Sequence, residues 1–164
     1  NAIKLGGRPA RDATAAWIAT MRRCAAAGLR VICYNFMPVV DWTRTAQHFA
    51  MPSGGLAMRF DWTDFAAYDL FVLRRAGAER DHPPARIAAA EARAARLTPE
   101  EAHALEHCVI AGLPGAEGSH DREGIRHLIA EYGDRGPDDL RAALRAFHEA
   151  VVPVARELGL RLCI

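Results

Sequence analysis

The sequence lacks long apolar runs and lacks an excess of either charge. No stretch reaches the roughly 18 consecutive apolar residues of a membrane-spanning helix, and we see no secretory signal at its start. The chain carries 21 Lys and Arg against 20 Asp and Glu, for a formal net charge of +1. Because nucleic-acid binding needs a concentrated basic face, this balance argues against nucleic acid as a partner. It also argues against a polybasic membrane anchor.

The sequence also lacks the cysteine pattern of a disulfide framework. Its four cysteines are Cys24, Cys33, Cys108 and Cys163, and no two of them form a CxxC motif or a regular spacing. In a chain of this length the pattern indicates reduced thiols and not structural disulfides. We therefore expect a cytoplasmic protein.

The composition is that of a globular domain. Of the 164 residues, 51% are hydrophobic and 25% are charged, and a chain of this size buries about 70% of its unfolded surface. The chain begins with Asn1 and ends on an apolar run, residues 160–164, that has no terminating turn. We interpret both ends as truncations of a longer protein.

The first elements expected are a helix and a buried strand. Apolar residues at helical spacing predict a helix from Asp12, as its cap, to about Ala27, ended by Gly28. In residues 29–36 bulky and smaller side chains then alternate, which predicts a strand. The bulky side chains of this strand should pack on helices. The smaller ones, which include Cys33 and Asn35, should face a barrel interior, where Cys33 and Cys163 would pack as small apolar residues.

The remaining pattern is mostly helical. We predict a hairpin over 48–60, helices over 61–74, 84–97, 98–112, 121–132 and 140–158, and a last strand from Leu160. Asp61 should cap one helix, Thr98 and Glu101 should form a capping box, and Pro153 should kink the last helix. Two strands with this much helix belong to a larger parallel sheet or barrel.

Six segments together carry a resemblance to a known family. The longest is residues 31–45, VICYNFMPVVDWTRT, and the five shorter ones are 3–6, 57–61, 65–68, 110–117 and 152–155. In sequence and order, over almost the whole chain, they resemble the mannonate dehydratase family. The resemblance implies an α/β fold, as a partial (β/α)8 TIM barrel of the xylose-isomerase-like kind. In that fold the domain 1–164 would comprise helix, barrel strand and active-site loop (1–47), a mostly helical insertion (48–136), and a helix with the start of the next strand (137–164).

The resemblance also implies an activity. It points to a lyase that dehydrates D-mannonate to 2-keto-3-deoxy-D-gluconate in hexuronate (glucuronate) catabolism, with Mn²⁺, Fe²⁺ or another divalent ion, in a homo-oligomeric parent protein. The family's metal ligands, His, Cys, His and Asp, lie on later strands beyond Ile164. We therefore assign no catalytic residue and no metal ligand here, and we expect the chain alone to be inactive and metal-free.

The loop after the first strand holds the candidate substrate-binding residues Asn35, Asp41, Trp42 and Arg44, because barrel enzymes build their sites at the carboxyl ends of strands. Arg44 would pair with a sugar-acid carboxylate, Asn35 and Asp41 would bind hydroxyls, and Trp42 would wall the pocket. The alternative is a structural loop, with Trp42 in the core and Asp41 and Arg44 as a local ion pair.

Two other motifs are weaker. His103 and His107 share a helix face and suggest a metal site, but a solvated helix face is the better interpretation. Gly112, Gly115 and Gly118 suggest a phosphate loop, but they follow a helix and lack the Lys-Ser or Lys-Thr of such loops, which favours a cap and turns.

Two other functions remain open at this point. One is a related TIM-barrel sugar isomerase or epimerase, which a substrate panel would distinguish. The other is a non-catalytic helical interaction module, which should fold cooperatively as a monomer with no exposed strand edge.

Overall fold

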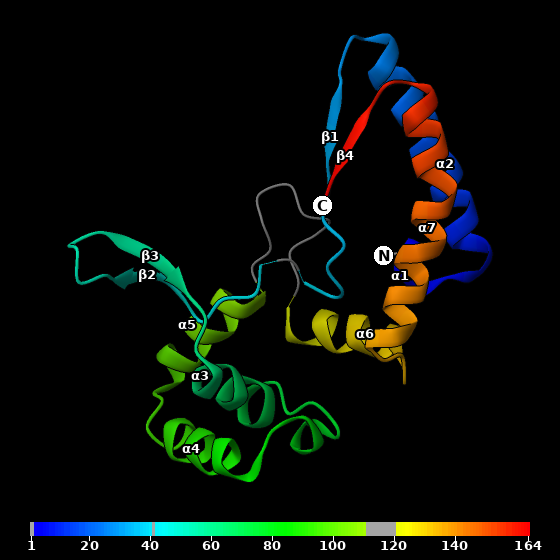
Figure 1. Ribbon diagram of the computed structural model, residues 1–164. Helices are drawn as coiled ribbons and strands as arrows, with labels where there is room; N and C mark the ends of the chain where they lie inside the picture. Colours follow the sequence, from blue (N-terminus) through cyan, green and yellow to red (C-terminus); the bar gives the residue numbers. More distant parts are fainter. Residues whose placement is uncertain (1, 41, 111–120) are drawn as a thin grey trace. The chain divides into compact units, whose positions relative to one another are not determined.

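The chain forms seven α-helices, short π- and 3-10 helices and four short strands in the part that the structure describes. In this computed structural model the described residues are 2–40, 42–110 and 121–164. In chain order (Figure 1), the elements are α1 (Ala2–Leu5), α2 (Gly7–Ala26), β1 (Val31–Cys33), β2 (Ala46–Ala50), β3 (Leu56–Arg59), α3 (Trp62–Ala67), the π-helix η1 (Tyr68–Val72), the 3-10 helix η2 (Ala78–Asp81), α4 (Pro84–Ala94), α5 (Pro99–Ile110), α6 (Arg122–Tyr132), α7 (Pro137–Glu157) and β4 (Arg161–Cys163).

The chain divides into two compact units. Unit 1 comprises residues 1–39 and 129–164, and unit 2 comprises residues 40–128. Unit 1 therefore joins the two ends of the sequence, and unit 2 is the segment between them. That these units belong to one partial barrel domain, with an insertion over 48–136, stays a prediction.

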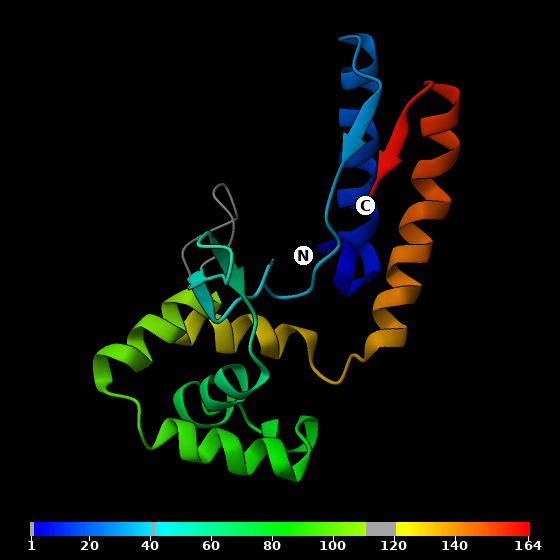
Figure 2. The ribbon, with the colours of Figure 1, turned by 60° about the vertical axis from the view of Figure 1, so that its left-hand side comes forward.

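Unit 1 is a layer of helices on a parallel strand pair. β1 and β4 pair in parallel and in register, as the sequence predicted, and α2 and α7 lie side by side (Figure 2). The core is a cluster of buried side chains from both helices and from the residue just before β4: Met21, Phe147, Val151, Ala155 and Leu160. Ile32 of β1, Leu162 of β4 and Tyr34, which follows β1, pack against this cluster. The prediction that the bulky side of the first strand faces helices is confirmed.

The helix α2 begins earlier than the sequence predicted. It starts at Gly7 after the N-cap Gly6, so Asp12 lies inside the helix and its assignment as the cap was wrong. Pro9 falls in the first turn, where the missing N–H costs nothing. The C-terminus of α2 lies where the sequence predicted it. Gly28, with φ of 86°, donates its N–H to Ala25 O, and Leu29 donates to Cys24 O, which is a Schellman motif.

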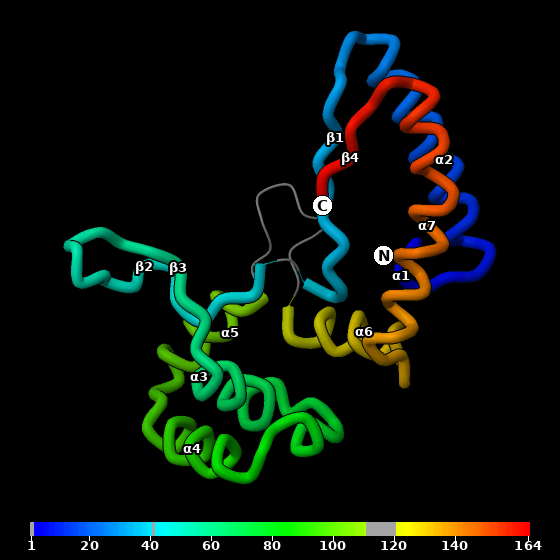
Figure 3. The backbone as a smooth tube through the Cα atoms, in the orientation of Figure 1, coloured from blue at the N-terminus to red at the C-terminus, as the bar shows by residue number. Residues whose placement is uncertain are grey.

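The tube in Figure 3 shows the return from α7 into β4 beside β1. Gly159, with φ of 65°, follows the C-terminus of α7, and Pro153 lies within that helix. Both strands span three residues, so β1 is shorter than the predicted 29–36. Within the described residues β1 pairs with β4 alone, and one neighbour supports only a short ladder.

Unit 2 is a hairpin with helices. β2 and β3 pair antiparallel, as predicted. The predicted helix over 61–74 is α3 continued by the π-helix η1, and Ala66 and Ala67 pack against Ala90 of α4. The predicted capping box at the start of α5 is confirmed: Thr98 N donates to Glu101 Oε2 at 2.9 Å, and Glu101 N donates to Thr98 Oγ1 at 3.2 Å.

Candidate functional site

The candidate segment begins on an exposed face of unit 1. Asn35 is exposed and follows β1 by two residues. Cys33 and Val31, which alternate with the buried-face residues, are exposed as well. The strand therefore presents one face to the helices and the other, with Asn35 at its carboxyl end, to solvent in unit 1.

The backbone after β1 adopts an unfavourable conformation at two residues. Val39 has φ of 63° and Trp42 has φ of 58°. A β-branched or bulky residue in the left-handed region is uncommon, because its Cβ meets the backbone there. Such conformations cost about 1–3 kcal/mol each and cluster at functional sites. This is an observation that the sequence pattern did not reveal.

Arg44 is a buried cation with spare donors. Arg44 is 9% exposed. Among the described residues its guanidinium makes one hydrogen bond, from Nη1 to Trp42 O at 3.2 Å. Its charge acts on the neighbouring thiol of Cys108. Burial raises the pKa of Cys108, and the Arg44 charge opposes that rise. A guanidinium has five N–H donors, so most of those of Arg44 have no hydrogen-bond acceptor among residues 2–40, 42–110 and 121–164.

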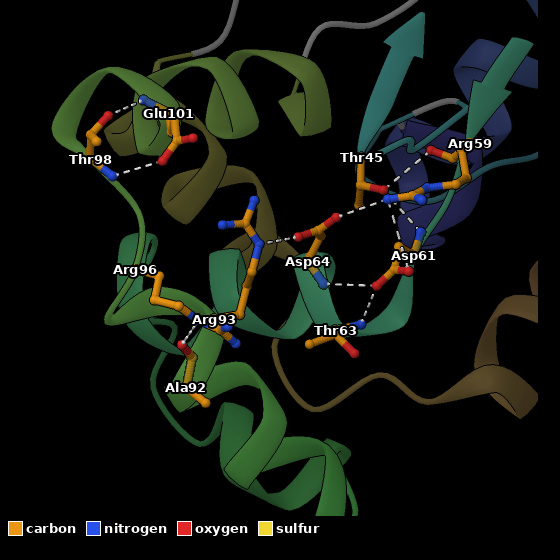
Figure 4. Close-up of polar contacts among 10 residues, drawn as sticks. All are labelled: Thr45, Arg59, Asp61, Thr63, Asp64, Ala92, Arg93, Arg96, Thr98 and Glu101. Atoms are coloured by element: carbon orange, nitrogen blue, oxygen red, sulfur yellow. Dashed lines mark hydrogen bonds and ion pairs between the residues drawn. The ribbon is translucent and has the colours of Figure 1, made fainter. Parts of the chain in front are cut away.

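Thr45 anchors the segment that carries Arg44. Its N–H and its hydroxyl both donate to Arg59 O, at 2.9 and 3.2 Å, and the hydroxyl accepts from Asp61 N at 2.9 Å (Figure 4). The hydroxyl thus ties the start of β2 to the end of β3 and to the cap of α3. Sequence reasoning missed this role, because nothing in the local pattern pairs Thr45 with residues fourteen positions on.

Trp42 is 48% exposed, so the alternative that placed it in the core does not hold within unit 2. Asp41 lies outside the described residues, and with it the proposed ion pair to Arg44. Asn35 belongs to unit 1, whereas Trp42 and Arg44 belong to unit 2, and each is described within its own unit. The structure therefore leaves the combined site a prediction.

A groove of about 520 Å³ lies in unit 2 next to this segment. Its lining residues come from β2 and the helices: Thr45, Ala46, Gln47, Asp64, Arg93, Glu101, His103, Ala104, Leu105, His107 and Cys108. Asp64 accepts from Arg93 Nε at 2.8 Å and from Arg59 Nη2 at 3.3 Å, as Figure 4 shows for the residues that it labels. The charges of Asp64 and Arg93 on this wall are therefore already paired with each other.

The metal hypothesis for His103 and His107 gains no support. Both side chains are exposed, and over residues 2–40, 42–110 and 121–164 no group of three or more His, Cys, Asp and Glu side chains is placed to hold an ion. The described residues thus do not fit the divalent ion that the resemblance implies. The glycines proposed as a phosphate loop, 112, 115 and 118, lie outside the described residues.

Comparison with known proteins decides the family. A family model described as D-mannonate dehydratase (UxuA) matches residues 1–164. The chain belongs to the mannonate dehydratase family. This membership confirms the resemblance that the segment 31–45 indicated.

Mannonate dehydratases of known sequence are similar to this chain over nearly all of its length. Mannonate dehydratase 2 of Agrobacterium fabrum is 44% identical over 162 residues, which are 99% of this chain and 41% of that protein. The mannonate dehydratase of Chromohalobacter salexigens is 46% identical over 162 residues, with the same coverage of 99% and 41%. The chain thus spans about two fifths of the length of these mannonate dehydratases.

A solved mannonate dehydratase shares the fold. The crystal structure of mannonate dehydratase from Streptococcus suis serotype 2 matches with a TM-score of 0.56 and 24% identity, covering 98% of this chain and 32% of that chain. The similarity supports the α/β fold described here. In the described part of the chain, no helix is long and apolar enough to cross a membrane.

Proposed function

We propose that this chain is the substrate-binding part of a protein that dehydrates D-mannonate to 2-keto-3-deoxy-D-gluconate. The support is its family and its similarity to mannonate dehydratases over 99% of its length. The observation that carries the role of this part is Arg44, a buried guanidinium that makes one hydrogen bond to the described residues and follows two residues with positive φ.

Arg44 would bind the carboxylate of the sugar acid. The dehydration removes a proton from the carbon next to this carboxylate and a hydroxyl from the following carbon. Negative charge grows on the carboxylate oxygens as the proton leaves. A fixed guanidinium stabilises that charge, and more strongly where water is excluded. Asn35 and Asp41 would hold hydroxyl groups, and Trp42 would cover the sugar.

The larger architecture is part of the same proposal. β1 and β4 would be neighbouring strands of a (β/α)8 barrel, in one partial domain with the helical segment as its insertion, in a cytoplasmic homo-oligomer. The divalent ion, Mn²⁺ or Fe²⁺, would polarise the substrate carboxylate and acidify the adjacent C–H. The described residues offer it no ligand set, so we assign it no step on this chain and expect the chain alone to be inactive.

The first test is substitution of Arg44 in the protein of full family length. Hydrogen bonds to charged groups contribute about 1.5–3 kcal/mol, so Arg44→Ala should lower kcat/KM by about 10- to 150-fold. Arg44→Lys should restore only part of the lost kcat/KM, because an ammonium does not pair with both carboxylate oxygens. Product formation would be followed by NMR.

The matched control is Arg141→Ala. The Arg141 side chain is 73% exposed and contacts Asp138 at 2.7 Å on the surface of α7, so this change should leave kcat/KM unaltered. If Arg44→Ala has full activity and unchanged stability, Arg44 does not bind the substrate. If the parent protein leaves mannonate intact but isomerises or epimerises other sugar acids in a substrate panel, the proposed reaction is wrong.

A further inference from the structure

The residue after Arg44 makes three hydrogen bonds within unit 2. Thr45 is buried. Its N–H and its hydroxyl donate to Arg59 O, and the same hydroxyl accepts from Asp61 N. Arg44, Thr45, Arg59 and Asp61 all lie in unit 2. One short side chain thus fixes the backbone directly after Arg44.

These bonds lie where the hairpin ladder is irregular. In the register of β2 and β3, Ala46 pairs with Arg59 and Phe49 pairs with Ala57, with a shift between the two pairs. Such a bulge leaves a residue unpaired and disrupts the ladder locally. The hydroxyl of Thr45 therefore adds contacts at the end of the hairpin next to a disrupted stretch of ladder.

The carbonyl that accepts from Thr45 belongs to a residue that is itself held in place. The guanidinium of Arg59 lies 4.5 Å from the centre of the Phe49 ring and donates from Nη2 to Asp64 Oδ2 at 3.3 Å. Asp64 also accepts from Arg93 of α4 at 2.8 Å. Residues of β2, α3 and α4 therefore hold the point to which Thr45 is bonded.

The segment before Thr45 depends on such support. Trp42 has φ of 58°, and a residue of this type keeps that conformation only where surrounding contacts enforce it. Arg44 donates from Nη1 to Trp42 O, which is its one hydrogen bond within the described residues. With so few contacts of its own, the Arg44 side chain takes its direction from the backbone that Thr45 fixes.

We propose that Thr45 is a positioning residue that orients the Arg44 guanidinium toward the carboxylate of the substrate. This inference rests on the proposed function and deepens it. The Thr45 hydroxyl is already bonded to Arg59 O and Asp61 N, so it acts through Arg44 and not on the substrate. A guanidinium that binds both carboxylate oxygens must lie in their plane, so a small rotation of its backbone loses one of the two bonds.

The test is a double-mutant cycle in the protein of full family length. Thr45→Val keeps the branched shape and the backbone N–H but loses both hydroxyl contacts. It should lower kcat/KM for D-mannonate by about 2- to 12-fold, the factor that corresponds to one ordinary hydrogen bond. The fall should be mainly in kcat, because negative charge grows on the carboxylate as the proton leaves. In the Arg44→Ala background, Thr45→Val should change kcat/KM by less than about twofold, because no guanidinium is left to orient.

Further variants separate the hydroxyl from the fold. Thr45→Ser keeps the hydroxyl and should keep nearly all of the parent kcat/KM, whereas Thr45→Ala should lose as much as Thr45→Val. The Ser and Ala pair isolates the hydroxyl even if the Val variant does not fold. The matched control is Thr20→Val, since the Thr20 hydroxyl donates to Ala16 O at 3.1 Å on an exposed part of α2. This control should leave kcat/KM unchanged, and chemical denaturation measures the stability of every variant separately.

The outcomes distinguish this inference from the proposed function. Full activity of Arg44→Ala would overturn substrate binding by Arg44 and the positioning role with it. A fully active Thr45→Val beside an impaired Arg44→Ala would overturn the positioning role alone. An equal fall in kcat/KM from Thr45→Val in both backgrounds would show that Thr45 supports only the fold. A fall in Thr45→Ser as large as in Thr45→Ala would show that the hydroxyl does not orient Arg44.

Discussion

At the scale of single residues, Asp69 in unit 2 is a buried carboxylate held by several partners. It is 3% exposed. Arg75 donates to both of its oxygens, from Nε at 2.8 Å and from Nη2 at 2.7 Å, and His82 Nε2 lies 3.0 Å from Oδ2. The Asp69 hydrogen bond is the largest cause of the raised pKa of Arg75. A charge this deeply buried is stable only because both partners are in place.

Asp69→Asn should therefore destabilise the protein strongly. Breaking a buried ion pair by removing one partner costs about 3–5 kcal/mol, and chemical denaturation would measure the loss. The matched control is Asp81→Asn. Asp81 also accepts from Arg75 at 2.8 Å, but its side chain is 62% exposed, so its loss should cost no more than about 1 kcal/mol. Equal costs would show that burial does not set the strength of this pair.

The residue scale is also where the sequence was least informative about the site. The motif DWTRT drew attention to Arg44, but its burial is a property of the folded chain that the motif does not contain. The positive φ values of Val39 and Trp42 have no signal in residue type, because neither residue favours that conformation. Asp69, Arg75 and His82 were missed for a similar reason: their pairing depends on how η1 and η2 fold back on each other.

At the scale of elements, local chemistry predicted where helices begin and end. Asp61 Oδ1 accepts from Thr63 N at 2.9 Å and from Asp64 N at 3.1 Å at the start of α3. These bonds satisfy N–H groups that no helical partner reaches. The cap also orients Asp64, which pairs with Arg93 of α4 at 2.8 Å.

Asp61→Ala should cost about 1 kcal/mol of stability, the usual value for a lost cap, and Asp61→Asn should be almost neutral because Asn caps as well as Asp. Both variants remove the ion pair of Asp61 with Arg59, which at 4.0 Å joins two partly exposed side chains and contributes little. Thermal unfolding of the three proteins separates the cap from the charge. A similar loss in both variants would mean that the charge, not the cap, matters.

At the scale of the whole molecule, each unit has buried apolar side chains and a strand pair with open edges within the described residues. In unit 1 a core cluster lies between α2, α7 and the strand pair, and in unit 2 one cluster lies between α3 and α4. β1 and β4 each pair on one side only, and β2 and β3 form a second pair, within the described residues. Unpaired strand edges promote association between chains.

Residues 1–164 expressed alone should therefore be marginally stable and should self-associate. Sedimentation velocity over a range of concentrations would detect the association, and calorimetry would detect a broad or irreversible transition. A stable monomer with a sharp, reversible transition would instead favour the independent helical module. The protein of full family length is the control, and it should be soluble and cooperative.

The sequence by itself determined the family, the helix and hairpin positions, most caps and the parallel relation of the two outer strands. These follow from local spacing, capping chemistry and a motif that is continuous along the chain, so no distant contact is needed to read them. Only the tertiary structure decided the division into two units, the buried ion pairs of Asp69, the burial of Arg44, and the pairing of Cys33 with Cys163 across the two strands. Those features depend on which residues distant in sequence pack together, and that is set by the burial of whole faces and not by any local pattern.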